Sequence, residues 1–105
     1  MPDFNKIFEQ AQQMQARMQQ VQSELEKQTV TAGAGGGMVS VEADGKGTIT
    51  RVKIDPSVAD PKDVEMLEDL ILVAVNEAQK KAAELAKSEM SRLAGGLNLP
   101  FKLPF

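Results

Sequence analysis

Two groups of residues have types and spacings that could support chemistry: the glycine-rich run at 33–37, GAGGG, and three carboxylates at Glu65, Glu68 and Asp69. A glycine-rich loop binds phosphate when its N–H groups face the anion, a helix follows directly, and a Lys-Ser or Lys-Thr pair completes the motif. None of these features follows Gly37, so we interpret the run as a turn between strands. The carboxylates have no neutral ligand nearby, which favours a solvated helix start over a metal site.

The chain lacks several of the residue types that most often serve in catalysis and metal binding. The 105 residues include no histidine, cysteine, tryptophan or tyrosine, so thiol and imidazole nucleophiles and the ligands that zinc prefers are absent. An enzyme is therefore the least favoured class of function, and we predict that the protein is not an enzyme and has no metal site and no small-molecule substrate. No segment approaches the ~18 consecutive apolar residues that cross a bilayer. This predicts a soluble, cytoplasmic protein without a membrane partner.

Positive charge gathers in the second half of the last predicted helix, although the formal net charge of the chain is −3. The basic residues there outnumber the acids, and they are Lys80, Lys81, Lys87 and Arg92. Arg17 and Lys27 of the first predicted helix could extend this group. Such residues could bind DNA phosphates, but compensation of the helix dipole alone would also place acids early and bases late. A second basic group is interpreted as protection of an exposed sheet face or edge, and it comprises Lys46, Arg51 and Lys53.

The first element that must position these groups is a long amphipathic helix at about residues 3–27. Its apolar residues alternate spacings of three and four, which is the seam of a coiled coil. The seam comprises Phe4, Ile7, Ala11, Met14, Met18, Val21 and Leu25. Because it runs for only about three heptads, it could pair with a second copy or with another helix of the chain. The glutamine-rich remainder is interpreted as a solvated surface, with a row of amides for a polar partner as the alternative.

The apolar period changes to two after this helix and predicts three strands, at about 28–32, 38–44 and 47–55. Asp44-Gly45, between the second and third strands, is typical of a tight hairpin turn in which glycine supplies a positive φ. We therefore expect a three-stranded antiparallel sheet.

A second long helix is predicted at about residues 61–94. Asp60 is a suitable N-cap, Pro61 suits the first helical position, and Gly95-Gly96 is typical of a helix end. At ~1.5 Å per residue this helix is about 50 Å long, whereas a strand of six to eight residues covers about 20–27 Å. The helix therefore outruns the sheet and can form a projecting arm with the first helix.

Apolar residues surround the first half of this helix more completely than one small sheet can cover. We predict that they form a homodimer interface, made by Leu70, Ile71, Leu72, Val73 and Val75. The second half narrows to an apolar stripe that can pair with the seam of the first helix. The predicted fold class is α+β, with a long N-terminal helix, a three-stranded antiparallel sheet and a long C-terminal helix in one domain at residues 1–96.

These elements resemble the YbaB/EbfC family of bacterial nucleoid-associated proteins. The resemblance rests on QQMQARMQQVQSEL, GGGMVSVEADGKGTITRVKIDP, EMLEDLILVAVNEAQKKAAE and the tail GGLNLPFKLPF. It implies a tweezer-like homodimer located in the cytoplasm and nucleoid that binds DNA without a cofactor or catalytic residue. It also implies a change in DNA conformation and a role in nucleoid organisation or gene regulation.

The DNA-binding hypothesis assigns phosphate contacts to the basic residues of both helices, with little base specificity, because no helix is built to enter the major groove. A rival hypothesis is a dimeric adaptor that binds another protein through its helical arms or its tail. The Leu-Pro-Phe sequence at residues 99–101 and again at 103–105 supports this alternative.

Overall fold

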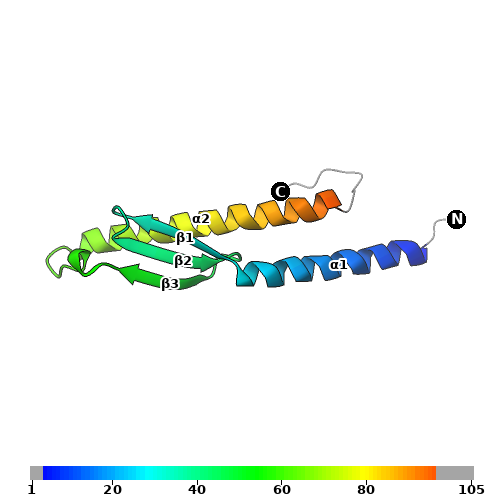
Figure 1. Ribbon diagram of the computed structural model, residues 1–105, viewed down its shortest axis with the longest axis horizontal. Helices are drawn as coiled ribbons and strands as arrows, with labels where there is room; N and C mark the ends of the chain where they lie inside the picture. The colour runs from blue at the N-terminus through cyan, green and yellow to red at the C-terminus, as the bar shows by residue number, and fades with distance from the viewer. Residues whose placement is uncertain (1–3, 97–105) are drawn as a thin grey trace.

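A computed structural model describes residues 4–96 as two long helices that flank a three-stranded sheet (Figure 1). The elements are α1 (Phe4–Lys27), β1 (Thr29–Ala34), β2 (Val39–Asp44), β3 (Ile49–Ile54), the 3-10 turn η1 (Pro56–Val58) and α2 (Val64–Gly96). The molecule is elongated, with principal extents of 74 × 22 × 16 Å. The predicted α+β class and order of elements are confirmed. Within the described range, no helix combines the length and hydropathy needed to cross a membrane.

The sheet has the strand order β1-β2-β3, and both strand pairs are antiparallel. The turn between β1 and β2 contains Gly35, Gly36 and Gly37, whose φ angles are +64°, +68° and +92°. Side chains other than glycine rarely adopt this left-handed region, which explains the glycine run. Its interpretation as a connection between strands is confirmed, since β2 follows it directly.

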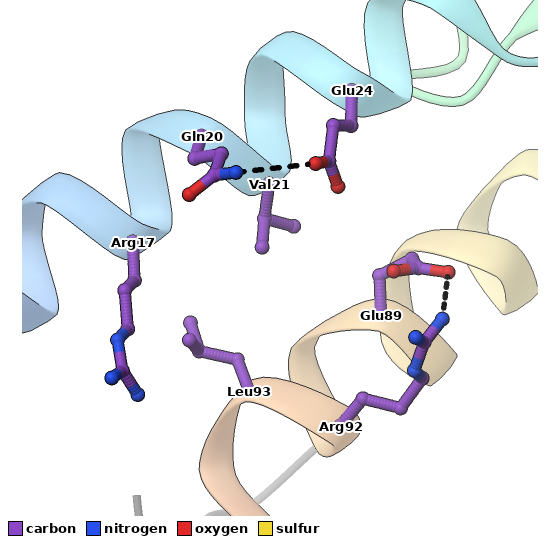
Figure 2. A pocket seen from close by; sticks show the side chains of 7 residues that line it. All are labelled: Arg17, Gln20, Val21, Glu24, Glu89, Arg92 and Leu93. Carbon is purple, nitrogen blue, oxygen red and sulfur yellow. Dashed lines mark hydrogen bonds and ion pairs between the residues drawn. The ribbon is translucent and has the colours of Figure 1, made fainter. Parts of the chain in front are cut away.

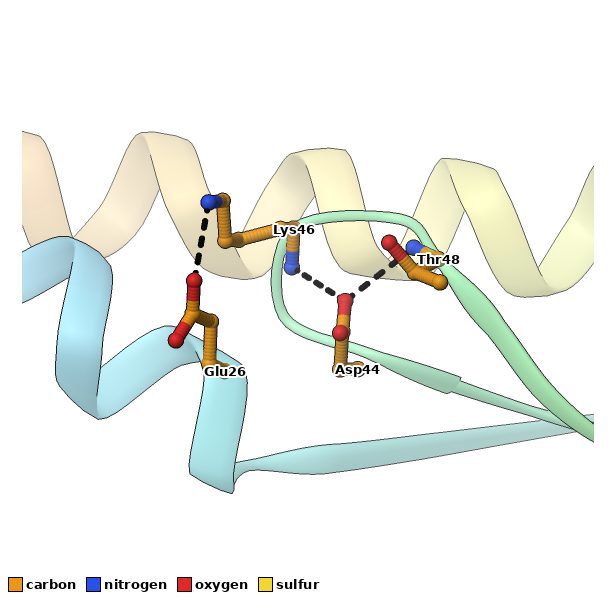
Figure 3. A network of polar contacts seen from close by, with 4 residues as sticks. All are labelled: Glu26, Asp44, Lys46 and Thr48. Atoms are coloured by element: carbon orange, nitrogen blue, oxygen red, sulfur yellow. Dashed lines mark hydrogen bonds and ion pairs between the residues drawn. The ribbon is translucent and has the colours of Figure 1, made fainter.

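The connection from β2 to β3 differs from the predicted two-residue turn. It spans four residues, and the positive φ occurs at Gly47 (+91°) and not at Gly45. Asp44 organises this loop, because its Oδ1 accepts hydrogen bonds from the backbone N–H groups of Lys46 at 2.9 Å and Thr48 at 3.0 Å (Figure 3). Gly45 is needed for space instead, since an added Cβ would lie 2.7 Å from the carbonyl oxygen of Leu25.

The core lies between α2 and one face of the sheet. Small residues at helical spacing, Ala74, Ala78 and Ala82, are fully buried and allow close approach of α2 to the strands. Ala74 and Ala78 belong to one core cluster with residues of β1 and β2, among them Val39 and Val41. The helix crosses β1 and β2 and makes little contact with β3. Val52 of β3 is therefore exposed although it pairs with the buried Val41.

The start of α2 corrects the prediction that this helix begins at residue 61 with Asp60 as its N-cap. Asp60 instead accepts a hydrogen bond from the N–H of Lys62 at 2.9 Å, and its carbonyl accepts from the N–H of Asp63 at 3.0 Å. The helix begins at Val64, and Asp63 caps it by accepting from the N–H of Met66 at 3.2 Å. Either aspartate could serve as a cap, and the φ of Pro61 suits a tight turn as well as a first helical turn.

Asp55 links β3 to the region before α2 by capping η1. Its Oδ1 accepts a hydrogen bond from the N–H of Ser57 at 2.9 Å. Hydrogen bonds from the backbone and side chain of Ser57, assisted by the charge of Lys53, lower the pKa of Asp55 below its usual 3.8. These interactions favour the ionised carboxylate, and they outweigh the opposing effect of its desolvation.

Candidate nucleic-acid interface

The two helices form an arm that consists of α1 and residues 80–96 of α2 (Figure 1). The arm is anchored where α1 meets the sheet: Leu25 is buried, and its carbonyl accepts a hydrogen bond from the N–H of Gly45 at 2.8 Å. The ammonium of Lys46 forms an ion pair with Glu26 at 3.0 Å beside this contact (Figure 3). The base of the arm is thus held by both apolar packing and polar contacts.

The seam of α1 packs against α2 in part, which is one of the two pairings that the sequence left open. Met14, Met18 and Val21 are half-buried, whereas Phe4 and Ile7 are exposed. The coverage of the seam therefore increases from the start of α1 toward its end at the sheet.

A cleft of about 330 Å³ between the helices is lined by Arg17 on the side of α1 and by Arg92 on the side of α2 (Figure 2). Arg17 extends from α1 toward α2, whereas Arg92 turns along α2 and contacts Glu89 at 3.1 Å. Glu24, which accepts a long hydrogen bond of 3.5 Å from Gln20, lines the same cleft. The cleft therefore balances two guanidinium groups with two carboxylates, so it is not a strongly positive site by itself.

Lys80 and Lys87 lie on one face of α2, because seven residues complete nearly two helical turns. Both side chains are exposed, and neither makes a hydrogen bond or ion pair with any residue in the part of the chain that the structure describes. Lys27 is also exposed and lies in the last turn of α1. These three predicted residues are open to a partner, whereas Arg92 already holds a carboxylate.

Lys81 has a structural contact that the sequence analysis missed. Its ammonium donates a hydrogen bond to the backbone carbonyl of Thr31 in the edge strand β1, at 2.8 Å. A lysine at a sheet edge also discourages pairing with another chain. The two residues are fifty positions apart, and no local pattern in the sequence indicates that they meet.

The second basic group is divided between two places. Lys46 pairs with Glu26 at the base of the arm. Arg51 and Lys53 line a depression of about 240 Å³ on the sheet together with Ser40 and Glu42, and the register places Glu42 opposite Arg51. A carboxylate opposite the arginine makes this surface a mixed-charge sheet face.

The described residues contain no group of three or more histidine, cysteine, aspartate or glutamate side chains placed to hold a metal ion. The carboxylates of Glu65, Glu68 and Asp69 are exposed on the first turns of α2. This arrangement agrees with a solvated helix start.

Comparison with known proteins identifies relatives along nearly the whole chain. Residues 1–97 match the model of the YbaB/EbfC DNA-binding family. A nucleoid-associated protein of Gemmatimonas aurantiaca is 52% identical over 103 residues, covering 98% of this chain and 99% of that protein. A nucleoid-associated protein of Clostridium novyi is 53% identical over 98 residues, covering 93% of this chain and 86% of its own length.

The fold is also similar to a solved structure. The crystal structure of an uncharacterized protein from Helicobacter pylori matches with a TM-score of 0.81 and 26% sequence identity, covering 90% of this chain and all of that one. The family is described as DNA-binding and the relatives are named as nucleoid-associated proteins, which confirms the prediction that this protein is not an enzyme. By its match over residues 1–97 and its half-identical relatives, the chain belongs to the YbaB/EbfC DNA-binding family.

Proposed function

We propose that this protein binds duplex DNA in the bacterial nucleoid as a tweezer-like homodimer, using phosphate contacts from its helical arms. Family membership and the names of the relatives support the DNA-binding role and the nucleoid location. Contacts to phosphates position a protein on DNA without reading its sequence, so base specificity is low. Two arms on one duplex would alter the path of the DNA, which connects binding to nucleoid organisation and gene regulation.

The observation that carries the proposed site is the exposed pair Lys80 and Lys87. Their shared face points away from the core, because the alanines at 74, 78 and 82 occupy the opposite side of α2. Lys27, Arg17, Lys81 and Arg92 complete the proposed set, but Lys81 and Arg92 must exchange or share the contacts that they already make. Lys80 and Lys87 make no such contact, so we assign them the largest part of the binding.

The proposed dimer interface is centred on Leu72 and Val73. Of the five apolar residues predicted for it, Leu70, Ile71 and Val75 are half-buried against the core of their own chain. Leu72 keeps 60% of its surface exposed, and Val73 is also exposed. A single chain therefore leaves the outer part of this group without cover.

The uncovered strand β3 extends this apolar surface. Gln79 donates a hydrogen bond to the carbonyl of Gly47, just before β3, at 3.3 Å. Leu72 lies seven residues before Gln79 and hence on the same side of α2, toward β3. Val52 of β3 is exposed on the sheet face that α2 packs against. A second copy that covered Leu72 and Val52 would complete the layer that α2 begins over β1 and β2.

The test is DNA binding measured over a range of salt concentrations with unrelated duplexes. Changing Lys80 and Lys87 to glutamine removes two charges per chain at little cost in helix propensity. Up to four phosphate contacts are lost per dimer, so the slope of log affinity against log salt should become shallower by up to about 3.6, at ~0.9 per contact. Affinity should fall similarly for each duplex.

The matched control changes Arg51 and Lys53 to glutamine, which removes the same charge from the sheet. A larger loss of affinity in this control would place the DNA on the sheet and refute the arm site. If the wild-type protein bound no duplex at low salt, the adaptor hypothesis would replace the DNA-binding one. The tail that also supports the adaptor hypothesis lies outside the described residues.

A further inference from the structure

The start of α1 exposes a cluster of large apolar side chains, the apolar tip, which consists of Phe4, Ile7 and Phe8. They are 74%, 56% and 66% exposed. Phe4 and Phe8 are one helical turn apart, and Ile7 adjoins both, so the three form one continuous patch. Exposed apolar patches in soluble proteins usually mark a surface that another segment or molecule covers.

The tip is exposed because α2 ends before it reaches this part of α1 (Figure 1). Val21 of α1 and Leu93 of α2 line the same cleft, and the two helices run in opposite directions. From Leu93, α2 continues for three residues to Gly96, which is about 4.5 Å, whereas α1 extends 17 residues from Val21 back to Phe4, which is about 25 Å. About 20 Å of the α1 seam therefore lies beyond the end of α2.

We propose that residues 97–105 of the same chain, LNLPFKLPF, cover the apolar tip as an extended segment that runs along α1. The segment starts where α2 ends, and its nine residues reach about 30 Å when extended, which is more than the 20 Å required. Pro100 and Pro104 favour an extended backbone over a helix.

The chemistry of the segment matches the surface. Every second residue is apolar, and these are Leu97, Leu99, Phe101, Leu103 and Phe105. In an extended chain they face one side at intervals of about 6.6 Å, close to the spacing of about 5 Å between seam residues of α1. Aromatic pairs between the segment and Phe4 or Phe8 add to the packing.

The rise per residue of α1 and of the extended segment also sets which of their residues lie opposite one another. Gly96 lies near the level of Met18, and α1 rises about 16.5 Å from Met18 to Ile7. Five extended residues after Gly96 cover the same distance, so Phe101 lies opposite Ile7. The segment therefore acts as a clasp that holds the start of α1 against the end of α2.

Amide hydrogen exchange of residues 4–11 in the full-length protein, measured without DNA, tests the clasp. The double variant Leu99→Ser with Phe101→Ser removes apolar side chains that face α1, and we expect exchange of residues 4–11 to become at least about tenfold faster. The matched control, Asn98→Ser with Lys102→Ser, alters the alternate positions and should leave the exchange unchanged. Equal exchange in the apolar variant and the wild type, or an equal effect of both variants, would overturn the proposal.

A disulfide distinguishes cover by the same chain from cover by a second copy. The natural chain has no cysteine, so the variant Ile7→Cys with Phe101→Cys carries only the two engineered thiols. Subunits with and without ¹⁵N are mixed before oxidation, and the cross-linked peptides are weighed by mass spectrometry. Cross-links within one isotopic species support the clasp, whereas mixed-isotope cross-links, or none, would contradict it. Because no DNA is present, these results are independent of the proposed DNA-binding function.

Discussion

The substitution Leu72→Asp separates the proposed dimer interface from the fold of the single chain. Leu72 keeps 60% of its surface exposed in one chain, so the aspartate remains solvated there and the monomer should fold. Ile71 is a poorer site for this test, because it packs against the core of its own chain and a charge there would unfold the monomer as well.

The magnitude follows from the exposed area. Complete burial of a leucine side chain stabilises by about 1.5–3 kcal/mol, so covering the remaining 60% contributes about 0.9–1.8 kcal/mol per copy. A symmetric dimer loses this contribution twice, about 1.8–3.6 kcal/mol, which raises the dimer Kd by about 20- to 400-fold. Burial of two unpaired carboxylates at the interface increases the loss further.

Analytical ultracentrifugation over a range of concentrations measures the dimer Kd, and circular dichroism confirms the fold. The control is Ser88→Asp, which adds the same charge to an exposed residue of the same helix about 24 Å further along. Leu72→Asp should yield a folded monomer, and Ser88→Asp should remain a dimer. A Leu72→Asp protein with the wild-type Kd would refute the interface, and a wild-type chain that is monomeric at micromolar concentration would refute the dimer.

Three further substitutions test other contacts. Gly45→Ala places a Cβ 2.7 Å from the carbonyl oxygen of Leu25, so the base of the arm must shift. Chemical denaturation should show that the free energy of unfolding falls by about 1–3 kcal/mol. Unchanged stability would mean that α1 is not anchored there. Lys81→Gln removes the hydrogen bond to Thr31 and should lower the free energy of unfolding by at most about 1.5 kcal/mol. It should change the slope of log DNA affinity against log salt less than either Lys80→Gln or Lys87→Gln does. A larger change in this slope would identify Lys81 as a principal phosphate contact. The lowered pKa of Asp55 stabilises the folded state above pH 3.8, and this stabilisation is lost as the pH falls through the lower folded-state pKa. Asp55→Asn should therefore be less stable than wild type at neutral pH and approach it in acid, and a stability difference that stays constant with pH would contradict this assignment.

The two helices, the three strands and the glycine turn can all be predicted from the amino-acid sequence. Their signals are local: an apolar period near 3.5 in residues 4–25, alternation in residues 39–43, and glycines where φ is positive. The start of α2 was missed by three residues because Asp60 and Asp63 can both cap a helix, and the sequence does not show which one accepts the bond. The basic residues of the candidate site were likewise identifiable by composition, because lysine and arginine carry their charge in any fold.

The contacts that those residues make depend on how the helices and strands pack against one another. The placement of α2 over β1 and β2 leaves Leu72 and Val52 exposed while Ile71 is covered, a difference that the all-apolar sequence of this region does not contain. Lys80 and Lys81 are adjacent in the sequence, yet the helical rotation of ~100° per residue leaves Lys80 open to solvent and brings Lys81 to Thr31. Gly45 is required for space and not for its φ, because α1 ends against it. Each of these outcomes depends on contacts between segments far apart in the chain, and the local periodicities that specify the elements carry no information about them.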